Sequence, residues 1–153
     1  MSIHSFEKKI VLPCTLPEAW AFFSNPQNLK LITPPEMGFD IVGEPPKKMY
    51  PGLLIQYIVR PMFNIPTTWL TEITHVHEPH FFVDEQRVGP YRMWHHQHHF
   101  TETSEGVLMH DIVTYIIPFG FLGDIMLPIV ENKLNGIFDY RTTQIEKKFG
   151  TKK

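Results

Sequence analysis

Residues 124–149 read DIMLPIVENKLNGIFDYRTTQIEKKF, and this stretch determines the fold because it requires the rest of the chain to form an apolar surface for it to cover. Its apolar residues recur at intervals of three and four, the spacing of one face of an α-helix. The pattern predicts one amphipathic helix of about 25 residues, with Pro128 in its first turn or at a kink. A helix of this kind needs an apolar surface to cover. Its stripe consists of Val130, Leu134, Ile137, Phe138, Ile145 and Phe149.

That surface is supplied by predicted β-strands upstream of the helix. Each strand is bounded by proline, glycine or polar turn residues, and the short gaps between consecutive strands indicate antiparallel hairpins. Because a meander of strands cannot bury its inner face alone, we expect the long helix to pack across it. The predicted strands cover residues 3–12, 39–42, 53–59, 67–76, 81–88, 91–100 and 107–117.

Two short helices are predicted after the first strand. Thr15 can cap a helix over residues 16–23, and Glu18 follows three residues later, as in a capping box. Asn25-Pro26 begins the second helix, which ends at Thr33-Pro34-Pro35 because proline cannot continue it.

Composition and charge narrow the class of protein. The chain has 153 residues, 42% hydrophobic and 20% charged, which is typical of a single globular domain covering residues 1–153. Its net charge of −2 gives no field that would recruit nucleic acid. The single cysteine, Cys14, excludes an internal disulfide, and no stretch approaches the ~20 apolar residues of a membrane span. We therefore expect a cytoplasmic protein of open oligomeric state, with no nucleic-acid partner.

Residues 94–100, Trp-His-His-Gln-His-His-Phe, give the strongest indication of a site. In a strand, Trp94, His96, His98 and Phe100 share one face, and the residues between them share the other. Either face would turn histidines inward, and we favour the first because its two aromatic residues have more apolar area to bury. Interior polar groups must be paired, so the run predicts a polar-lined cavity.

The order of these elements and their motifs resembles the helix-grip fold of the START/pollen-allergen superfamily, often called SRPBCC, over nearly the whole chain. The resemblance is strongest to a bacterial ligand-binding subgroup of poorly defined function. The motifs are Leu12-Pro13 before Pro17-Glu18-Ala19-Trp20, Asn25-Pro26 with Leu29, Ile32-Thr33-Pro34, Asp84 to Gly89-Pro90, Trp94-x-His96-x-His98-x-Phe100, Asp111 to Tyr115 with Pro118-Phe119-Gly120, and Ile137 to Arg141.

The resemblance implies an α+β domain, in which a curved antiparallel sheet of about six or seven strands wraps around the long C-terminal helix. A cavity lies between sheet and helix in the superfamily. Its members bind lipids, sterols, polyketides and plant hormones, and some catalyse cyclisation, dehydration or ring hydroxylation. Pollen-allergen relatives have a glycine-rich loop where residues 43–52 are proline-rich here, so we expect no phosphate or nucleotide site there.

Arg141 lies near the middle of the apolar helix stripe. A guanidinium keeps its charge and must find partners, so one hypothesis is that Arg141 reaches Asp84 or Asp111 beneath the helix. The alternative is that its long side chain extends past the edge of the stripe into water. The central position favours the buried pair.

His96 and His98, with a carboxylate such as Asp111 on the neighbouring strand, have the donor types that bind Zn²⁺ or Fe²⁺. A lone His-x-His is a weak signal, so we predict no metal. We expect both histidines to be neutral and hydrogen-bonded to Asp84, Asp111, Tyr115 or water, with His95 and His99 solvated on the outer face. Cys14 is interpreted as a packing residue and not as a nucleophile.

The favoured function is the binding of a small hydrophobic or amphipathic organic molecule. Asp84, His96, His98 and Asp111 would orient its polar end, and Arg141, as their expected ion-pair partner, is counted with the binding residues. The favoured function implies no cofactor. Two alternatives stay open: a cyclase-, dehydratase- or hydrolase-like enzyme that uses a His/Asp pair in the same cavity, and a protein-interaction module with a closed groove. The aromatic residues expected to line the cavity, or else to fill it, are Trp69, Phe82, Trp94, Phe100, Tyr115 and Phe138.

Overall fold

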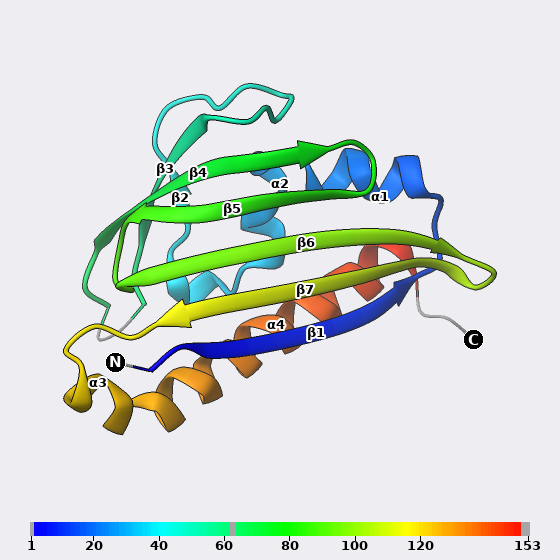
Figure 1. Ribbon diagram of the computed structural model, residues 1–153. Coiled ribbons are helices and arrows are strands. Elements are labelled where there is room, and N and C mark those ends of the chain that lie inside the picture. Colours follow the sequence, from blue (N-terminus) through cyan, green and yellow to red (C-terminus); the bar gives the residue numbers. More distant parts are fainter. Residues whose placement is uncertain (1, 62–63, 151–153) are drawn as a thin grey trace.

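A seven-stranded antiparallel sheet dominates the computed structural model, which describes residues 2–61 and 64–150 (Figure 1). The strand order is β1-β7-β6-β5-β4-β3-β2, so the chain runs as a meander from β2 to β7, and β1 closes the far edge beside β7. This is the predicted helix-grip arrangement. The strands are β1 (His4–Leu12), β2 (Asp40–Ile41), β3 (Leu53–Val59), β4 (Thr67–His77), β5 (Phe81–Val88), β6 (Met93–Thr103) and β7 (Gly106–Ile116).

Short helices follow β1, as predicted, and begin with α1 (Leu16–Phe23). The capping box is present: the Glu18 amide donates to Oγ1 of Thr15, and the Thr15 amide donates to the Glu18 carboxylate at 2.8 Å. This arrangement satisfies amides that the first helical turn would leave unpaired. The chain continues through α2 (Pro26–Leu29) and two 3₁₀ turns, η1 (Lys30–Ile32) and η2 (Pro35–Met37).

The C-terminal helix α4 (Leu127–Phe149) has 23 residues and starts later than predicted. Residues 124 and 125 belong instead to a separate short helix, α3 (Phe121–Ile125). Pro128 explains the break, because it has no N–H to donate to the carbonyl of residue 124 and can only occupy a first turn. The prediction of one continuous helix from residue 124 was therefore wrong by three residues.

Helices α1 and α4 cover the same face of the sheet, with α4 packed against β1 and η1 and α1 against β6 and β7 (Figure 1). On β6 the side chains of Trp94, His96, His98 and Phe100 are buried beneath them, which confirms the predicted inward face. Register shifts between β4 and β5 accompany the curvature of the sheet around α4. None of the helices in the described ranges is long and apolar enough to cross a lipid bilayer.

Replacing Gly106 by alanine tests how tightly the β6–β7 turn packs on the end of β1. Its φ is +124°, and a Cβ added there would lie 2.2 Å from the Leu12 carbonyl oxygen. G106A should therefore lower the free energy of unfolding by about 1–3 kcal/mol. A Cβ at Gly136, on the exposed face of α4, meets nothing within 4 Å, so G136A should raise the same quantity by about 0.5–1 kcal/mol.

Chemical denaturation of both variants measures the two effects. Both variants introduce the same methyl group. Opposite changes in the free energy of unfolding would therefore reflect the local backbone at each position and not a general effect of replacing glycine by alanine. A G106A variant as stable as wild type would contradict the described packing of the turn.

Candidate functional site

A cavity of about 870 Å³ lies between the sheet and α4. It has the size of a small-molecule binding site, so the groove is open and not filled by its aromatic side chains. Eight of the predicted site residues line it: Trp69, Phe82, Asp84, Trp94, His96, His98, Phe138 and Arg141.

Three predicted site residues, Phe100, Asp111 and Tyr115, do not line the cavity. Phe100 is 1% exposed and packs edge-on against Trp20 of α1, in the core beyond the cavity wall. Tyr115 is equally buried and lies against the ring of His4. Asp111 does not reach the cavity surface but contacts the lining residues His96, His98 and Arg141. All three face inward as predicted, but facing inward does not place a side chain at the cavity surface.

Sequence reasoning missed several lining residues, among them Thr71, Tyr57 and Lys133. The period-two pattern of β4 could have found Thr71, because it shares a face with Trp69, and Tyr57 pairs with Trp69 across β3 and β4. No pattern marks Lys133, which reaches the cavity from an exposed position on α4.

The strand register brings the polar side chains together. Asp84 of β5 pairs directly with His96 of β6, and His98 pairs directly with Asp111 of β7. All four side chains point toward the helix side of the sheet. We call these four residues the histidine–aspartate cluster.

Contacts within the cluster are short. The two imidazole rings are in contact, with centroids 3.7 Å apart and planes tilted by 35°. Oδ1 of Asp111 lies 2.9 Å from Nε2 of His96 and 2.9 Å from Nδ1 of His98. Oδ2 of Asp84 lies 2.7 Å from Nε2 of His98 but 3.8 Å from Nδ1 of His96.

His98 is the charged member of the pair of histidines. Each of its ring nitrogens faces a carboxylate oxygen, which can only accept a proton, so both nitrogens must carry one. Burial alone would lower the pKa of His98, but the hydrogen bonds and charges of Asp111 and Asp84 outweigh burial and raise it. The prediction of two neutral histidines was therefore wrong for His98.

His96 is neutral, as predicted. Burial and the neighbouring charge of His98 lower the pKa of His96 despite its hydrogen bond to Asp111. That hydrogen bond places the proton on Nε2, so Nδ1 carries a lone pair. Nδ1 makes no hydrogen bond to any residue that the structure describes, because the nearest Asp84 oxygen is 3.8 Å away.

The two carboxylates are ionised. Burial would raise the pKa of Asp111, but its hydrogen bonds to His96 and His98 hold that pKa far below its ordinary value. Burial opposes ionisation of Asp84 as well, and the hydrogen bond from His98 lowers the Asp84 pKa in the same way. The carboxylates of Asp84 and Asp111 and the imidazolium of His98 are therefore ions that the fold largely buries and that stabilise one another beside the neutral His96.

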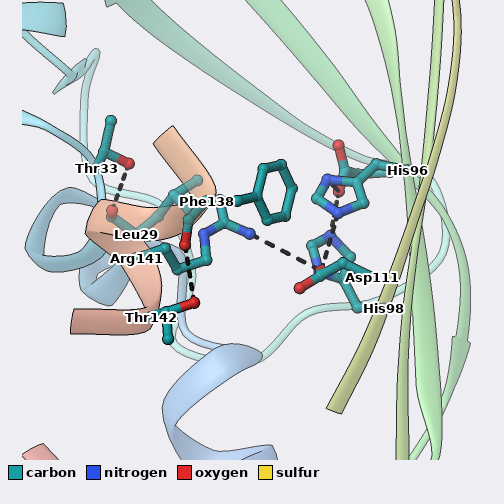
Figure 2. A network of polar contacts seen from close by, with 9 residues as sticks. Leu29, Thr33, His96, His98, Asp111, Phe138, Arg141 and Thr142 are labelled. Carbon is teal, nitrogen blue, oxygen red and sulfur yellow. Dashed lines mark hydrogen bonds and ion pairs between the residues drawn. The ribbon is translucent and has the colours of Figure 1, made fainter. Parts of the chain in front are cut away.

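Arg141 reaches the cluster from α4, as the hypothesis of a buried pair predicts. Figure 2 shows its side chain extending toward Asp111 and His98, beside Phe138 from the same helix. Nη1 lies 3.8 Å from Oδ1 of Asp111, and the guanidinium carbon lies 4.7 Å from the centre of the Phe138 ring. The residue is only 8% exposed, which contradicts the alternative of a side chain in water.

Asp84, His96 and His98 also have the donor types of a metal site, and their ligand atoms lie within 4.8 Å of one another. Two histidines and a carboxylate fit Zn²⁺ or Fe²⁺. A metal would have to displace the proton from His98 and break the ion pairs of the cluster. The expectation of no metal at this position stays a prediction.

The remaining candidates lie away from the cavity. His95 is hydrogen-bonded to Glu85 and His99 to Gln97 on the outer face, where both histidines are half-buried. Burial, and then the charge of Glu18, raises the pKa of the Cys14 thiol. A raised pKa disfavours the thiolate, in agreement with a packing role for Cys14.

Comparison with known proteins identifies the fold. No family model matches the chain, and no curated protein sequence matches it. A solved START superfamily protein from Mycobacterium smegmatis superposes with a TM-score of 0.70 at 9% identity, over 95% of this chain and 97% of that one. The chain has the START-like helix-grip fold.

Two further solved structures share this START-like fold. The ginseng major latex-like protein 151 from Panax ginseng gives a TM-score of 0.67 at 12% identity, over 96% of this chain and 97% of its own. The protein Ara h 8.0201 gives 0.63 at 18% identity, over 95% of this chain and 99% of its own. Identities this low establish the fold and leave ligand and activity to the site itself.

NMR can measure the assigned protonation states directly. At neutral pH, long-range ¹H–¹⁵N spectra should show His98 protonated on both ring nitrogens and His96 protonated only on Nε2. On titration, His98 should lose its proton above its ordinary pKa near 6.5 and His96 should gain one below it. Two histidines that titrate together near 6.5 would contradict the described contacts.

The raised pKa of His98 also makes the free energy of unfolding depend on pH. Because the pKa of His98 is raised on folding, its contribution is complete below the unfolded-state pKa and is lost as the pH rises through the folded-state pKa. The difference in the free energy of unfolding between wild type and H98Q should therefore shrink with rising pH above about 7. Denaturant titrations over that range measure it, and a constant difference would contradict the charged state of His98.

Proposed function

We propose that the protein binds a small hydrophobic or amphipathic organic molecule in the cavity between the sheet and α4. The observation that carries this proposal is an open cavity of about 870 Å³ with aromatic side walls and one wall of paired charges. Small-molecule sites combine mostly apolar walls with a few convergent polar groups in this way. The START-like fold supports the same proposal.

Different side chains would contact the apolar body and the polar end of such a ligand. Trp69, Phe82, Trp94 and Phe138 cover its apolar body. Its polar end faces the histidine–aspartate cluster, where Asp84, His96 and His98 reach the cavity surface and Asp111 holds the histidines in place. The proposal requires no cofactor and no nucleic acid, and we place the protein in the cytoplasm.

Filling the cavity tests the proposal. Thr71 is 5% exposed and lines the cavity from β4, so T71F would put a phenyl ring in the space of the ligand. N-phenyl-1-naphthylamine, a neutral dye that fluoresces in apolar sites, should bind wild type and bind T71F at least about tenfold more weakly, a difference of about 1.4 kcal/mol.

T101F is the matched control, because Thr101 is exposed near the end of β6 and does not line the cavity. Its dye affinity should equal that of wild type. Equal binding by all three proteins would place the dye outside the cavity and contradict the proposal. Native mass spectrometry of the purified protein would complement the titration, since a bound molecule adds mass that denaturation removes.

One observation favours a second candidate function, an enzyme acting on the same ligand. His96 is oriented by Asp111 through Nε2, and its unprotonated Nδ1 makes no hydrogen bond; general bases in enzymes are held in this way. Nδ1 would remove a proton from a carbon beside a carbonyl group. The C–H electron pair would form the C=C bond of an enolate while the C=O π pair moves to the oxygen, and His96 would return the proton to the carbon.

Deuterium exchange tests this second function. The compound released from the purified protein, returned to it in D₂O, should gain one mass unit for each exchanged carbon-bound hydrogen if His96 acts as the base. H96Q should slow this exchange by roughly 10²-fold or more, while dye binding reports that its cavity is intact. The absence of exchange with wild type would leave binding as the function of the site. The third alternative, a module with a closed groove, is disfavoured by the open cavity.

A further inference from the structure

The guanidinium of Arg141 lacks partners that a buried cation needs. Within residues 2–61 and 64–150 it donates no hydrogen bond: Nε is buried and unpartnered, and the carboxylate oxygen nearest to Nη1 is 3.8 Å away. The face of the Phe138 ring stabilises the positive charge but accepts no conventional hydrogen bond. A charge removed from water without such bonds is costly, so the fold holds Arg141 ready for an acceptor.

The acceptor has to come from the cavity. Arg141 lines it, together with Asp84, His96 and His98. The acidic members of this wall are already engaged, because His98 bridges Asp84 and Asp111. Of these four residues, Arg141 is therefore the one whose donors have no partner in the described part of the chain, whereas Arg60, which also lines the cavity, lies 4.0 Å from Asp40.

We propose that the ligand is an amphipathic carboxylic acid whose carboxylate binds the guanidinium of Arg141 while its apolar body lies along the aromatic walls. This inference rests on the proposed function and specifies the class of ligand. A planar carboxylate accepts two parallel hydrogen bonds from the planar guanidinium. It also brings a single negative charge close to Asp111, whereas a phosphate monoester would bring nearly two.

A competing location for the carboxylate exists on the same helix. Lys133 also lines the cavity, and its Nζ donates to the carbonyl oxygen of Pro61 and forms no ion pair with an acidic residue in the part of the chain that the structure describes. Lys133 is exposed, so an ion pair there would be screened by water and weak. The buried guanidinium should bind a carboxylate more strongly, and the two positions can be separated by mutation.

The experiment displaces N-phenyl-1-naphthylamine from the cavity with dodecanoate or with dodecan-1-ol, at a pH near 8 where the acid is ionised. The two competitors share the same chain length and differ in the head group. The ratio of the alcohol's dissociation constant to the acid's should fall by at least about tenfold from wild type to R141Q. In K133Q, the matched loss of a cavity-lining positive charge, the ratio should stay within about twofold of wild type.

The possible outcomes separate this inference from the function on which it rests. Dye that binds and is displaced with the same ratio in wild type and R141Q would overturn the carboxylate proposal and leave the cavity function standing. A ratio lost in K133Q but kept in R141Q would overturn the assignment to Arg141. Dye that does not bind wild type at all would refute the proposed function, and this inference with it.

A second measurement does not depend on the folding of R141Q. The carboxyl ¹³C resonance of [1-¹³C]dodecanoate, added to wild type, should shift on binding and show a nuclear Overhauser contact to the guanidinium protons of Arg141. Bound dodecanoate whose carboxylate contacts only Lys133 would contradict the proposal. R141K should recover only part of the preference for the acid, because an ammonium keeps the charge but lacks the planar pair of donors.

Discussion

Two carboxylates, the buried Asp111 and the partly buried Asp84, hold the imidazolium of His98 between them, and the interior is arranged around this set of ions. It draws on three neighbouring strands, because the register of β5, β6 and β7 brings the three side chains to one face. A slip of β6 by one residue would turn His98 outward and leave both carboxylates without it. The same contacts that form the polar wall of the cavity therefore also fix the pairing of the strands.

The helix completes the balance of charge. The two carboxylates and His98 alone would leave one negative charge under an apolar stripe, and Arg141, in the middle of that stripe, cancels it. A charged guanidinium does not suit an apolar stripe, but this one neutralises the negative charge of the buried carboxylate beneath it. It also links the placement of α4 to the sheet, since a different crossing of the helix would separate Arg141 from Asp111. The open space beside these ions persists because polar side chains form part of its wall.

Periodicity accounts for most of what the sequence predicted. The stripe from Val130 to Phe149 and the alternation around His96 placed the helix, the inner face of β6 and the partners of Arg141 correctly. Other features depend on distances that no pattern encodes. Whether Tyr115 reaches the cavity depends on how the helix crosses the sheet, and the charge of His98 depends on two carboxylates meeting it from different strands. The start of α4 was predictable in principle from the missing N–H of Pro128.

The distribution of free hydrogen-bonding groups separates binding from catalysis at this site. Groups that carry out acid–base chemistry need a proton or a lone pair available to the substrate. Here both nitrogens of His98 face carboxylates, and Asp111 is shielded behind the rings. Among the described residues of this wall, the base left free is Nδ1 of His96, whereas the free donors belong to Arg141. In this wall the two carboxylates are paired with the imidazolium of His98, and Arg141 keeps donors without partners. Such a wall favours the binding of a hydrogen-bond acceptor. Chemistry at the same wall would have to proceed through a single nitrogen.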